Sequence, residues 1–559
     1  MTFKPRQLTT LVSLYVMAKL VWVIFSGLLV KAHTSTPKKP HIVMIVADDM
    51  GYQDVGFRGS DIQTPILDRL ARSGVILENH YVMPVCAPTR ASLMTGRHAI
   101  RTGFWRSNLM PVEKFGLGLD ETLLPEMLRR NSYSTYGVGK WHCGAHTWSH
   151  TPAKRGFDTF FGTFLGSQDY FTHRNTQADW LDLRDAYLDE NGELVDKVRE
   201  DLDGQYNTRL FSRKSVEIIQ RHDKTRPMFL YLAYTAPHIP DGAPTEDIKK
   251  FASPSMSAER QTYAAMVSVM DEGVGEVVAA LRSRGMTDNT VIVFISDNGA
   301  RFSSQGSNYP LRGGKGSVLE GGVRGVAFVN SPLLQKTGYT NRNIHHVTDW
   351  YATFRDLAGD EPGKHGKIQL PIDGVNIWRS LSDGEPCRDE VLLNLRDTSK
   401  QGACSDTPES VSTYEDAGSS KKLSGIELKK GLPILAQDFF AVRQQKWKLI
   451  TGSAFELRGW SSENRQEGFV GFSDDRGKTH QRSLASGTLL FDLESDVREE
   501  HNVAELHPEV VKTLLQRKNH YLKEVKFLER RQFDYDVVME DGIFRPWVED
   551  STNDTISVS

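Results

Sequence analysis

The chain has 559 residues, of which 39% are hydrophobic and 25% are charged, and its formal net charge is -3 at pH 7. This length exceeds what one small core supports, so two domains are expected, and the composition excludes an intrinsically disordered chain. The small net charge excludes a global field of the kind that attracts nucleic acid, so no nucleic-acid partner is predicted.

The N-terminal segment has the pattern of a targeting sequence. A basic start is followed by an apolar run that Lys19 interrupts, and Val30 and Ala32 place short side chains at the positions that a signal peptidase reads. We predict a cleaved signal peptide over residues 1–32, which places the mature chain in the secretory pathway, in the lysosome or outside the cell. An uncleaved anchor is the alternative, because the run is long enough to span a bilayer, but Lys19 near its middle is unfavourable there. No stable membrane span is expected after cleavage.

Residues 33–385 alternate between apolar runs of strand length and helical patterns. Continuous apolar strands separated by helices indicate a parallel or mixed sheet that helices cover on both faces. The predicted fold class is therefore α/β, with a large mixed, mostly parallel sheet sandwiched by helices. We predict strands at 41–47, 134–139, 228–234, 291–296 and 326–330, and helices at 64–71, 121–130 and 258–284.

A smaller α+β domain is predicted over residues 386–545, followed by a tail at 546–559. Its first part, residues 388–440, is rich in Ser, Lys and Gly and is predicted to be a long surface excursion or a partly disordered segment. Strand patterns follow at 439–449 and 488–493, and helical spacing returns at 510–522.

The four cysteines are too few for a disulfide scaffold. Cys387 and Cys404 are close enough in sequence to pair in an oxidising compartment, and Cys143 would then remain a free thiol if Cys86 is modified. A single glycosylation sequon begins at Asn553 in the C-terminal tail and marks a candidate N-glycan site.

Polar side chains follow four of the predicted strands at the point where each strand ends. In an open α/β sheet, ligands bind outside the carboxyl ends of the strands, so these side chains are expected to meet at one edge of the sheet. They are Asp48 and Asp49 after strand 41–47, Lys140 and His142 after 134–139, His238 after 228–234, and Asp297 and Asn298 after 291–296.

Two of these strand ends supply oxygen ligands for a metal. The carboxylates of Asp48, Asp49 and Asp297 and the carboxamide of Asn298 suit Ca²⁺ or Mg²⁺ better than Zn²⁺, which draws on His and Cys. A single Asp after a strand is usually a turn or cap residue, but the coincidence of such residues at two strand ends favours a metal site.

The remaining strand-end residues carry charge and protons that suit an oxyanion. Lys140, His142 and His238 are of this kind, and Lys315 lies in a Gly-rich loop whose backbone can approach an anion closely. Taken singly, each has a plain structural explanation as a surface lysine, a hydrogen-bonded core histidine or part of a flexible connection.

The segment 86–97 reads Cys-Ala-Pro-Thr-Arg-Ala-Ser-Leu-Met-Thr-Gly-Arg and predicts a helix with Pro88 in its first turn and Gly96 at its end. Cys86 then lies just ahead of a helix N-terminus, where partial positive charge and free N–H groups favour an anion. Taken alone, the cysteine is also compatible with an ordinary buried thiol.

The pattern Cys86-x-Pro88-x-Arg90, followed by Leu-Met-Thr-Gly-Arg, resembles the motif of the sulfatase family. In that family the cysteine is oxidised to formylglycine by a formylglycine-generating enzyme in the endoplasmic reticulum. The resemblance implies a fold like that of alkaline phosphatase. It also rests on the segments 47–51 (Ala-Asp-Asp-Met-Gly), 139–142 (Gly-Lys-Trp-His), 296–299 (Ser-Asp-Asn-Gly) and 311–322.

Two further segments, 155–158 (Arg-Gly-Phe-Asp) and 166–170 (Gly-Ser-Gln-Asp-Tyr), make the chain look like the arylsulfatase B, I and J branch of that family. Arylsulfatase B removes the 4-sulfate of N-acetylgalactosamine in dermatan and chondroitin sulfate. The branch thus implies a sulfated glycan of that kind, or an aryl sulfate, as substrate. The sequence departs from the family pattern at Thr89 (usually Ser), Ser132 (usually Gly) and Cys143 (usually Leu).

The resemblance implies a role for each candidate residue. Hydrated formylglycine at position 86 carries two hydroxyls, of which one attacks sulfur and the other later expels sulfate. One Ca²⁺ would be held by residue 86 with Asp48, Asp49, Asp297 and Asn298, and Asp297 would also accept the proton of the attacking hydroxyl. Arg90 would hold the formylglycine, Lys140 and Lys315 would bind sulfate oxygens, His238 would protonate the leaving oxygen, His142 would accept the proton of the second hydroxyl, and Gln168 would line the substrate pocket.

Two other functions compete with this one. A phosphatase or phosphodiesterase of the alkaline phosphatase superfamily would share the sheet, but such enzymes use Ser or Thr as nucleophile and usually two metals. A catalytically inactive lumenal glycan-binding homologue would keep the fold without the chemistry, whereas every expected catalytic group is present in this sequence.

Overall fold

A computed structural model of the chain describes residues 39–105, 108–301, 304–361, 370–396, 439–452, 472–473, 479–480, 487–526, 534 and 537–550. The predicted signal peptide, Cys404 and Asn553 lie outside these residues. Cys387, which the sequence offers as a partner for Cys404, is a free thiol, as is the buried Cys143. Every helix in the described part of the chain is too short or too polar to cross a membrane.

The fold is built on a ten-stranded mixed sheet with a parallel centre. Strands β8, β1, β7, β3 and β4 run parallel to one another, whereas β9, β5 and β6 run antiparallel to their neighbours. The predicted α/β fold class is confirmed. In spatial order the strands are β10 (Tyr339–His346), β2 (Val75–Tyr81), β9 (Ala327–Asn330), β8 (Thr290–Ser296), β1 (His41–Ala47), β7 (Met228–Ala233), β3 (Ser134–Lys140), β4 (Thr159–Thr163), β5 (Arg184–Leu188) and β6 (Leu194–Val198).

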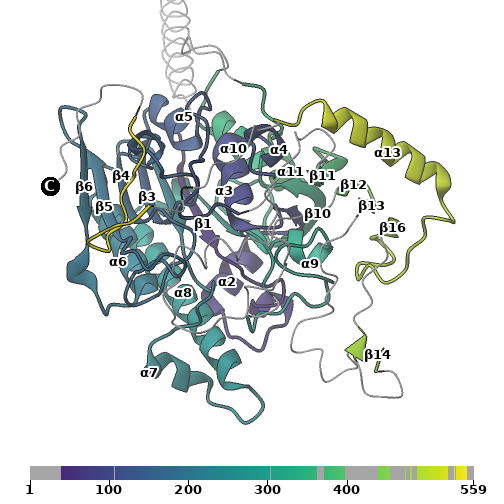
Figure 1. Cartoon of the computed structure of the whole chain (residues 1–559), viewed down its shortest axis with the longest axis horizontal. Coiled ribbons are helices and arrows are strands. Elements are labelled where there is room, and N and C mark those ends of the chain that lie inside the picture. The colour runs from purple at the N-terminus through teal and green to yellow at the C-terminus, as the bar shows by residue number, and fades with distance from the viewer. Residues whose placement is uncertain are drawn as a thin grey trace, which may run out of the picture. The chain divides into compact units, whose positions relative to one another are not determined.

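Helices cover both faces of this sheet (Figure 1), and alternate side chains of its central strands enter two different cores. Met44 and Val46 of β1 pack with α3, α5 and α10, whereas Val43 and Ile45 pack with α2, α6 and α8. All of β1 is buried, which explains its continuous apolar sequence. The helices are α2 (Pro65–Ser73), α3 (Cys86–Thr95), α4 (Ala99–Thr102), α5 (Leu124–Arg130), α6 (Asn207–Arg221), α7 (Thr245–Ile248), α8 (Ala258–Ser283), α9 (Glu320–Val323), α10 (Asp349–Leu357), α11 (Trp378–Asp383) and α13 (Pro508–Leu522).

A four-stranded antiparallel sheet forms a smaller C-terminal domain. Leu514 of α13 packs on one of its faces. The opposite face packs against Val318 and Leu319, which directly precede α9, and against Val323 of α9 itself. In spatial order its strands are β11 (Glu390–Arg396), β12 (Phe439–Gln444), β13 (Trp447–Gly452) and β16 (Gly487–Asp492), and a separate pair is formed by β14 (Phe472–Ser473) and β15 (Thr479–His480).

The predicted surface excursion is wrong in its first part. Residues 390–396 form β11, which pairs with β12 and buries Leu393 and Leu395 completely; residues 397–438 lie outside the described part. The helix predicted from 121 begins only at Leu124. Strands β2, β5, β6 and β10 were not predicted, because polar side chains interrupt their apolar pattern, as in the sequence YTNRNIHH of β10.

Four histidines are buried where the edge of the large sheet meets the smaller sheet. His80 lies on β2, His345 and His346 lie on β10, and His98 caps α4; none is more than 5% exposed. The His98 Nε2 is 3.0 Å from the Leu392 carbonyl of β11. Burial lowers the pKa of His80 and of His345 to about 3 and that of His98 to about 4, so the folded chain holds these rings neutral.

We expect the free energy of unfolding to decrease as the pH is lowered from about 6.5 to about 4. The unfolded chain takes up protons on these rings that the folded chain does not, so the stability they contribute is complete above their ordinary pKa and is lost as the pH falls. Each ring contributes up to about 1.4 kcal/mol per pH unit. Thermal unfolding across this range should give a shallower slope for His345→Gln than for the surface control His501→Gln. Equal slopes would contradict the expectation.

Candidate active site

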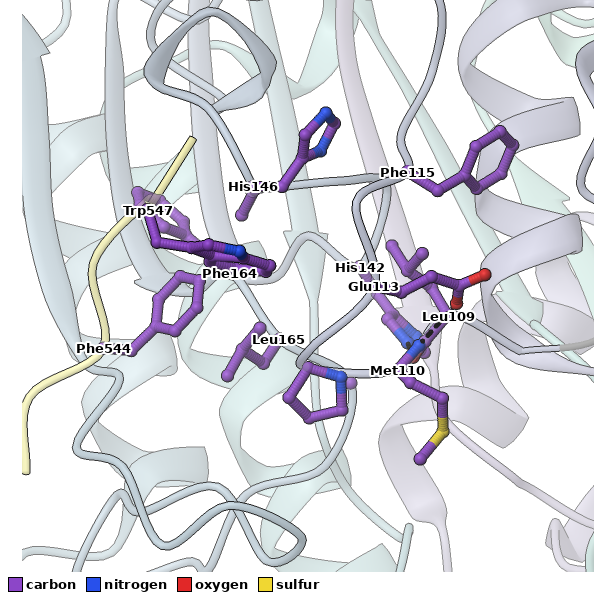
Figure 2. A pocket seen from close by; sticks show the side chains of 13 residues that line it. Leu109, Met110, Glu113, Phe115, His142, His146, Phe164, Leu165, Phe544 and Trp547 are labelled. Atoms are coloured by element: carbon purple, nitrogen blue, oxygen red, sulfur yellow. Dashed lines mark hydrogen bonds between the residues drawn. The ribbon is translucent and has the colours of Figure 1, made fainter. Parts of the chain in front are cut away.

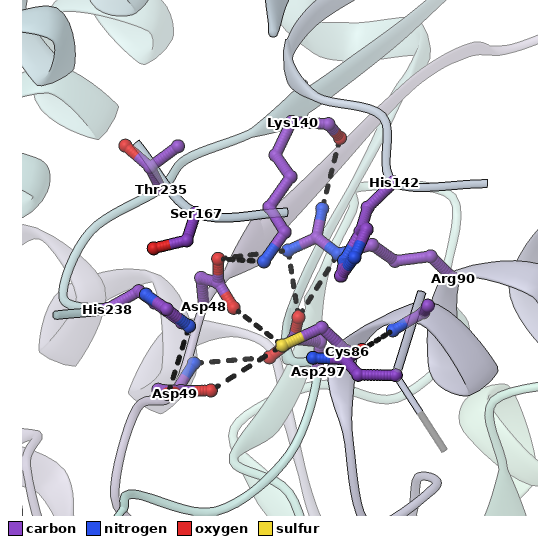
Figure 3. Close-up of polar contacts among 12 residues, drawn as sticks. Asp48, Asp49, Cys86, Arg90, Lys140, His142, Ser167, Thr235, His238 and Asp297 are labelled. Atoms are coloured by element: carbon purple, nitrogen blue, oxygen red, sulfur yellow. Dashed lines mark hydrogen bonds and ion pairs between the residues drawn. The ribbon is translucent and has the colours of Figure 1, made fainter. Parts of the chain in front are cut away.

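The carboxyl ends of the adjacent strands β8, β1, β7 and β3 bring the predicted polar residues together (Figure 3). Ala47, the last residue of β1, pairs in register with Ser296, the last residue of β8. Asp48 and Asp297 therefore follow at the same level of the sheet, and both are completely buried. Lys140 is the last residue of β3 and is equally buried.

Cys86 is the first residue of α3, and its side chain points into this cluster. Val85 before it is extended, and Gly96 ends the helix in the left-handed region at φ 67°, as the sequence predicted. The Cys86 Sγ lies 3.2 Å from Asp48 Oδ1. Burial, together with repulsion from Asp297, raises the pKa of the thiol well above its usual range, so the protonated thiol donates to Asp48.

Three buried carboxylates face three cations in this cluster. Each carboxylate has its own partner, so none is left as an isolated charge, which would cost several kcal/mol in the interior. Lys140 Nζ lies 2.6 Å from Asp48 Oδ2, Lys315 Nζ lies 2.8 Å from Asp49 Oδ2, and Arg90 donates from Nε and Nη2 to Asp297 Oδ2 at 3.1 and 2.8 Å.

The carboxylates differ in proton affinity because their surroundings differ. Burial and repulsion from Asp48 raise the pKa of Asp297 to about 6, although Arg90 opposes them. Burial also raises the pKa of Asp49, but Lys315 outweighs it and holds that pKa well below its usual range. Burial lowers the pKa of the Lys315 ammonium, and attraction to Asp49 more than offsets this. Asp297 therefore takes up a proton more readily than Asp49 does.

The oxygen atoms of the cluster fit a divalent cation. Asn298 Nδ2 donates to Asp49 Oδ1 at 2.7 Å, whereas Asn298 Oδ1 is buried and has no partner. Such an orphaned buried acceptor is unusual, and a hard cation such as Ca²⁺ would complete it. Ligand atoms of Asp48, Asp49, Cys86 and His238 lie within 4.8 Å of one another. A cation here would give the cluster a positive charge, which suits an anionic substrate.

Each of the two histidines has one ring nitrogen fixed by a backbone carbonyl. His142 Nε2 lies 2.9 Å from the Leu109 carbonyl, which assigns the proton to Nε2 and leaves the buried Nδ1 lone pair without a partner. His238 Nδ1 donates to the Ile239 carbonyl, so its Nε2 accepts from Lys315 Nζ at 3.1 Å. His142 thus offers a free base, and His238 is joined to a proton donor.

An apolar pocket lies behind His142 (Figure 2). Burial of the ring beside this pocket, together with the charge of Lys140, lowers the pKa of His142 well below its usual range. A Cβ at Gly166 would lie 2.4 Å from His142 Nε2, so only glycine leaves room for the ring. The pocket is lined by Leu109, Phe115, Phe164, Leu165, Phe544 and Trp547, among others.

The structure does not bring Gln168 into the charged cluster. Its Nε2 donates to the carbonyls of His173 and Asp182, at 3.1 and 2.9 Å. Its Oε1 accepts from Asn207 Nδ2 at 3.2 Å, and the residue is only 2% exposed. The amide is therefore satisfied within the protein.

Two residues that the sequence reasoning did not select support the site. Thr89 Oγ1 donates to the Asp297 carbonyl at 2.6 Å. Asn108 Oδ1 accepts from the Ala87 N–H at 3.0 Å, at the N-terminus of α3. Thr89 lies inside the Cys-x-Pro-x-Arg motif, so its polar side chain at that place could have been selected from the sequence. Asn108 lies in a loop that carries no pattern.

A family model described as Sulfatase matches residues 40–360, which include every member of this cluster. The chain belongs to the sulfatase family. As a member of that family, it is a hydrolase that acts on sulfate esters.

Known relatives agree with this assignment. This sulfatase is 37% identical to arylsulfatase J of Mus musculus over 499 residues, which cover 88% of this chain and 77% of the relative. It is 32% identical to N-acetylgalactosamine-6-sulfatase of Homo sapiens over 375 residues, which cover 63% and 67% of the two chains. The crystal structure of Ps i-CgsB in complex with k-i-k-neocarrahexaose matches with a TM-score of 0.65 at 29% identity, covering 87% of this sulfatase and 94% of that chain.

The fold also occurs outside sulfate chemistry. The phosphonate monoester hydrolase of Agrobacterium radiobacter matches with a TM-score of 0.53 at 17% identity, covering 87% of this sulfatase and 95% of that chain. At this identity the likeness concerns the fold alone, so the chemistry of the chain has to be argued from its own residues.

We expect Ca²⁺ to stabilise this sulfatase through the amide of Asn298. After treatment with a chelator, added CaCl₂ should raise the melting temperature. A cation that binds only the folded chain adds about 2.7 kcal/mol to the free energy of unfolding when its free concentration is 100 times its Kd. Asn298→Leu should reduce this shift, since it removes the orphaned oxygen. The buried Asn341→Leu, on β10, is the matched control and should keep the shift. A wild-type melting temperature independent of Ca²⁺ would contradict the expectation.

Proposed function

We propose that this sulfatase desulfates a sulfated galactosamine glycan of the N-acetylgalactosamine 4-sulfate type, and aryl sulfates, by means of formylglycine made from Cys86 and one Ca²⁺. The position of Cys86 carries the proposal. It begins α3, its Sγ lies 3.2 Å from Asp48 Oδ1, and Lys140 and Lys315 each pair with a carboxylate that the Sγ contacts. A nucleophile at this point would meet the sulfur of an ester whose oxygens lie among cations.

The groups absent from the structure would supply the nucleophile and part of the charge. The Cys86 sulfur stands in for the oxygens of formylglycine, which when hydrated would supply a geminal diol as nucleophile. A Ca²⁺ held by residue 86, Asp48, Asp49, Asp297 and Asn298 would supply positive charge to the sulfate oxygens.

The substrate would approach through His238 and Lys315. The side chains of these two residues are 11% exposed, whereas those of Asp48 and Lys140 are completely covered. Lys140 and Lys315 would bind sulfate oxygens. His238, hydrogen-bonded to Lys315, would pass a proton to the leaving oxygen.

Two bases remain for the protons of the diol. Asp297 accepts from Arg90 and from the Asp49 N–H, and it would take the proton of the attacking hydroxyl. His142 has its unpartnered Nδ1 available, and it would take the proton of the second hydroxyl as sulfate leaves. The Leu109 carbonyl supports this assignment, because it holds the other proton on Nε2.

The compartment and the biosynthetic partner follow from the same proposal. Formylglycine formation requires a formylglycine-generating enzyme, which acts in the secretory pathway. The predicted signal peptide over residues 1–32 would bring the chain to that enzyme. We further propose that the mature sulfatase works in the lysosome or outside the cell, with an N-glycan at Asn553.

We expect Cys86→Ala to lower the turnover of an aryl sulfate by at least about a thousandfold, because alanine leaves no nucleophile. The melting temperature should change little, and Cys387→Ala should keep full activity as the matched control. Mass spectrometry of the peptide that contains position 86 should detect formylglycine in the active wild type. An active enzyme whose peptide carries only an intact thiol would refute the proposed nucleophile.

A panel of sulfated saccharides tests the substrate. We expect N-acetylgalactosamine 4-sulfate to be hydrolysed with a higher kcat/KM than the 6-sulfate, with sulfate release as the measurement. Faster sulfate release from the 6-sulfate would contradict the proposed 4-sulfate and would favour the 6-sulfate, as in the name of the relative N-acetylgalactosamine-6-sulfatase. Faster turnover of phosphate monoesters than of every sulfate ester would contradict the proposal as a whole.

A further inference from the structure

Lys315 is delivered into the cluster by a loop that closes on itself at its base. The Gly321 N–H donates to the Arg312 carbonyl at 2.7 Å, so residues 312 and 321 lie side by side. Within the loop, the Lys315 N–H donates to the Ala300 carbonyl at 3.1 Å, and Gly316 has a φ of 86°. The Gly316 N–H also donates to the Pro84 carbonyl at 2.7 Å, so the place of the Lys315 ammonium depends on these contacts at the tip and on what holds the base of the loop.

Glu499 holds both ends of that base. Its Oε2 accepts from the Glu320 N–H at 2.7 Å, and its main-chain carbonyl accepts from Arg312 Nη1 at 2.7 Å. Glu499 follows β16 in the C-terminal domain, 179 residues beyond Glu320. One residue of the smaller domain thus joins the two ends of a loop that belongs to the larger domain.

The carboxylate of Glu499 belongs to a buried ionic network. Lys448 Nζ of β13 lies 2.7 Å from Glu499 Oε1 and 2.9 Å from Glu320 Oε1, and all three side chains are 0% exposed. Tyr81 OH donates to Glu320 Oε2 at 2.8 Å. Apolar residues of similar volume commonly give equal or greater stability than such a network, so stability alone does not explain why the chain keeps it.

The backbone of Glu499 is also unusual. Its φ is 55°, in the left-handed region that residues other than glycine seldom adopt. Such a conformation is strained and persists where several contacts fix it together. At Glu499 these contacts are the ones to Arg312, Glu320 and Lys448, together with a hydrogen bond from its own N–H to the Asp496 carbonyl at 3.2 Å.

We infer that Glu499 is a positioning residue, which fixes the loop 312–321 so that the Lys315 ammonium meets the sulfate ester. The smaller domain then affects catalysis through its contacts with this loop. The apolar contacts of Val318, Leu319 and Val323 with the face of its sheet support the loop from the same side. This inference rests on the proposed function, in which Lys315 binds sulfate and takes part in protonating the leaving oxygen.

The test compares variants of Glu499 with a control in the same domain. Glu499→Ala should lower kcat/KM for an aryl sulfate at least about tenfold, because a small misplacement of a catalytic group has large effects on rate. Glu499→Gln keeps an acceptor for the Glu320 N–H and should recover most of the activity. Glu390→Ala removes the pairing of β11 with Arg517 without touching the loop, and it should match the wild type. Equal kcat/KM in Glu499→Ala and Glu390→Ala would overturn the inference.

A double-mutant cycle separates positioning from a general loss of stability. In the Lys315→Ala background, Glu499→Ala should reduce kcat/KM by much less than it does alone, because the group that the loop carries is gone. If the two substitutions instead lower kcat/KM independently, so that their separate fold-losses multiply in the double variant, the inference is overturned. Arg312→Met, a milder variant, removes one of the two contacts and should show the same pattern with a smaller loss.

Hydrogen exchange provides a readout that does not depend on sulfate chemistry. Amides of residues 312–321 should exchange faster in Glu499→Ala than in Glu390→Ala. Unchanged exchange in this segment would overturn the positioning role even if the enzyme hydrolyses sulfate esters. A wild type that hydrolyses no sulfate ester would instead refute the proposed function, and the exchange data would still decide whether Glu499 holds the loop.

Discussion

The burial of three carboxylates at the ends of β1 and β8 is the constraint on which the rest of this structure depends. Asp48, Asp49 and Asp297 lie at adjacent strand ends without access to water, and their mutual repulsion has to be balanced locally. Arg90, Lys140 and Lys315 provide that balance. Helix α3, the end of β3 and the loop at 312–321 each supply one of these cations.

The same balance leaves a place for a cation and an anion. Three carboxylates and three cations are neutral together, so a divalent cation among the oxygens would make the cluster positive. An anionic ester is then attracted to a site from which water is largely excluded, where each charge acts more strongly than in bulk water. The unpartnered amide oxygen of Asn298 and the unpartnered Nδ1 of His142 are the two buried atoms that such a complex would use.

The smaller domain contributes to the site although none of the cluster residues belongs to it. One face of its sheet packs against the segment that carries Lys315, and the other packs against α13 and the region of α4. Similar folds occur in hydrolases of other esters at low sequence identity, so the scaffold does not define the reaction. The residues at the strand ends, the loop that carries Lys315 and the helix that begins at Cys86 define it.

The sequence by itself determined the central strands, the polar residues that follow them and the helix that begins at Cys86. These features depend on local patterns, since a fully buried parallel strand is continuously apolar and its carboxyl end is a fixed place in the sheet. Only the tertiary structure decided that Gln168 is satisfied inside the protein, that residues 390–396 are a buried strand, and that Asn108 and Glu499 support the site. Each of these depends on a contact between distant segments, such as the 179 residues between Glu320 and Glu499, and such a contact leaves no periodic or local signal in the chain.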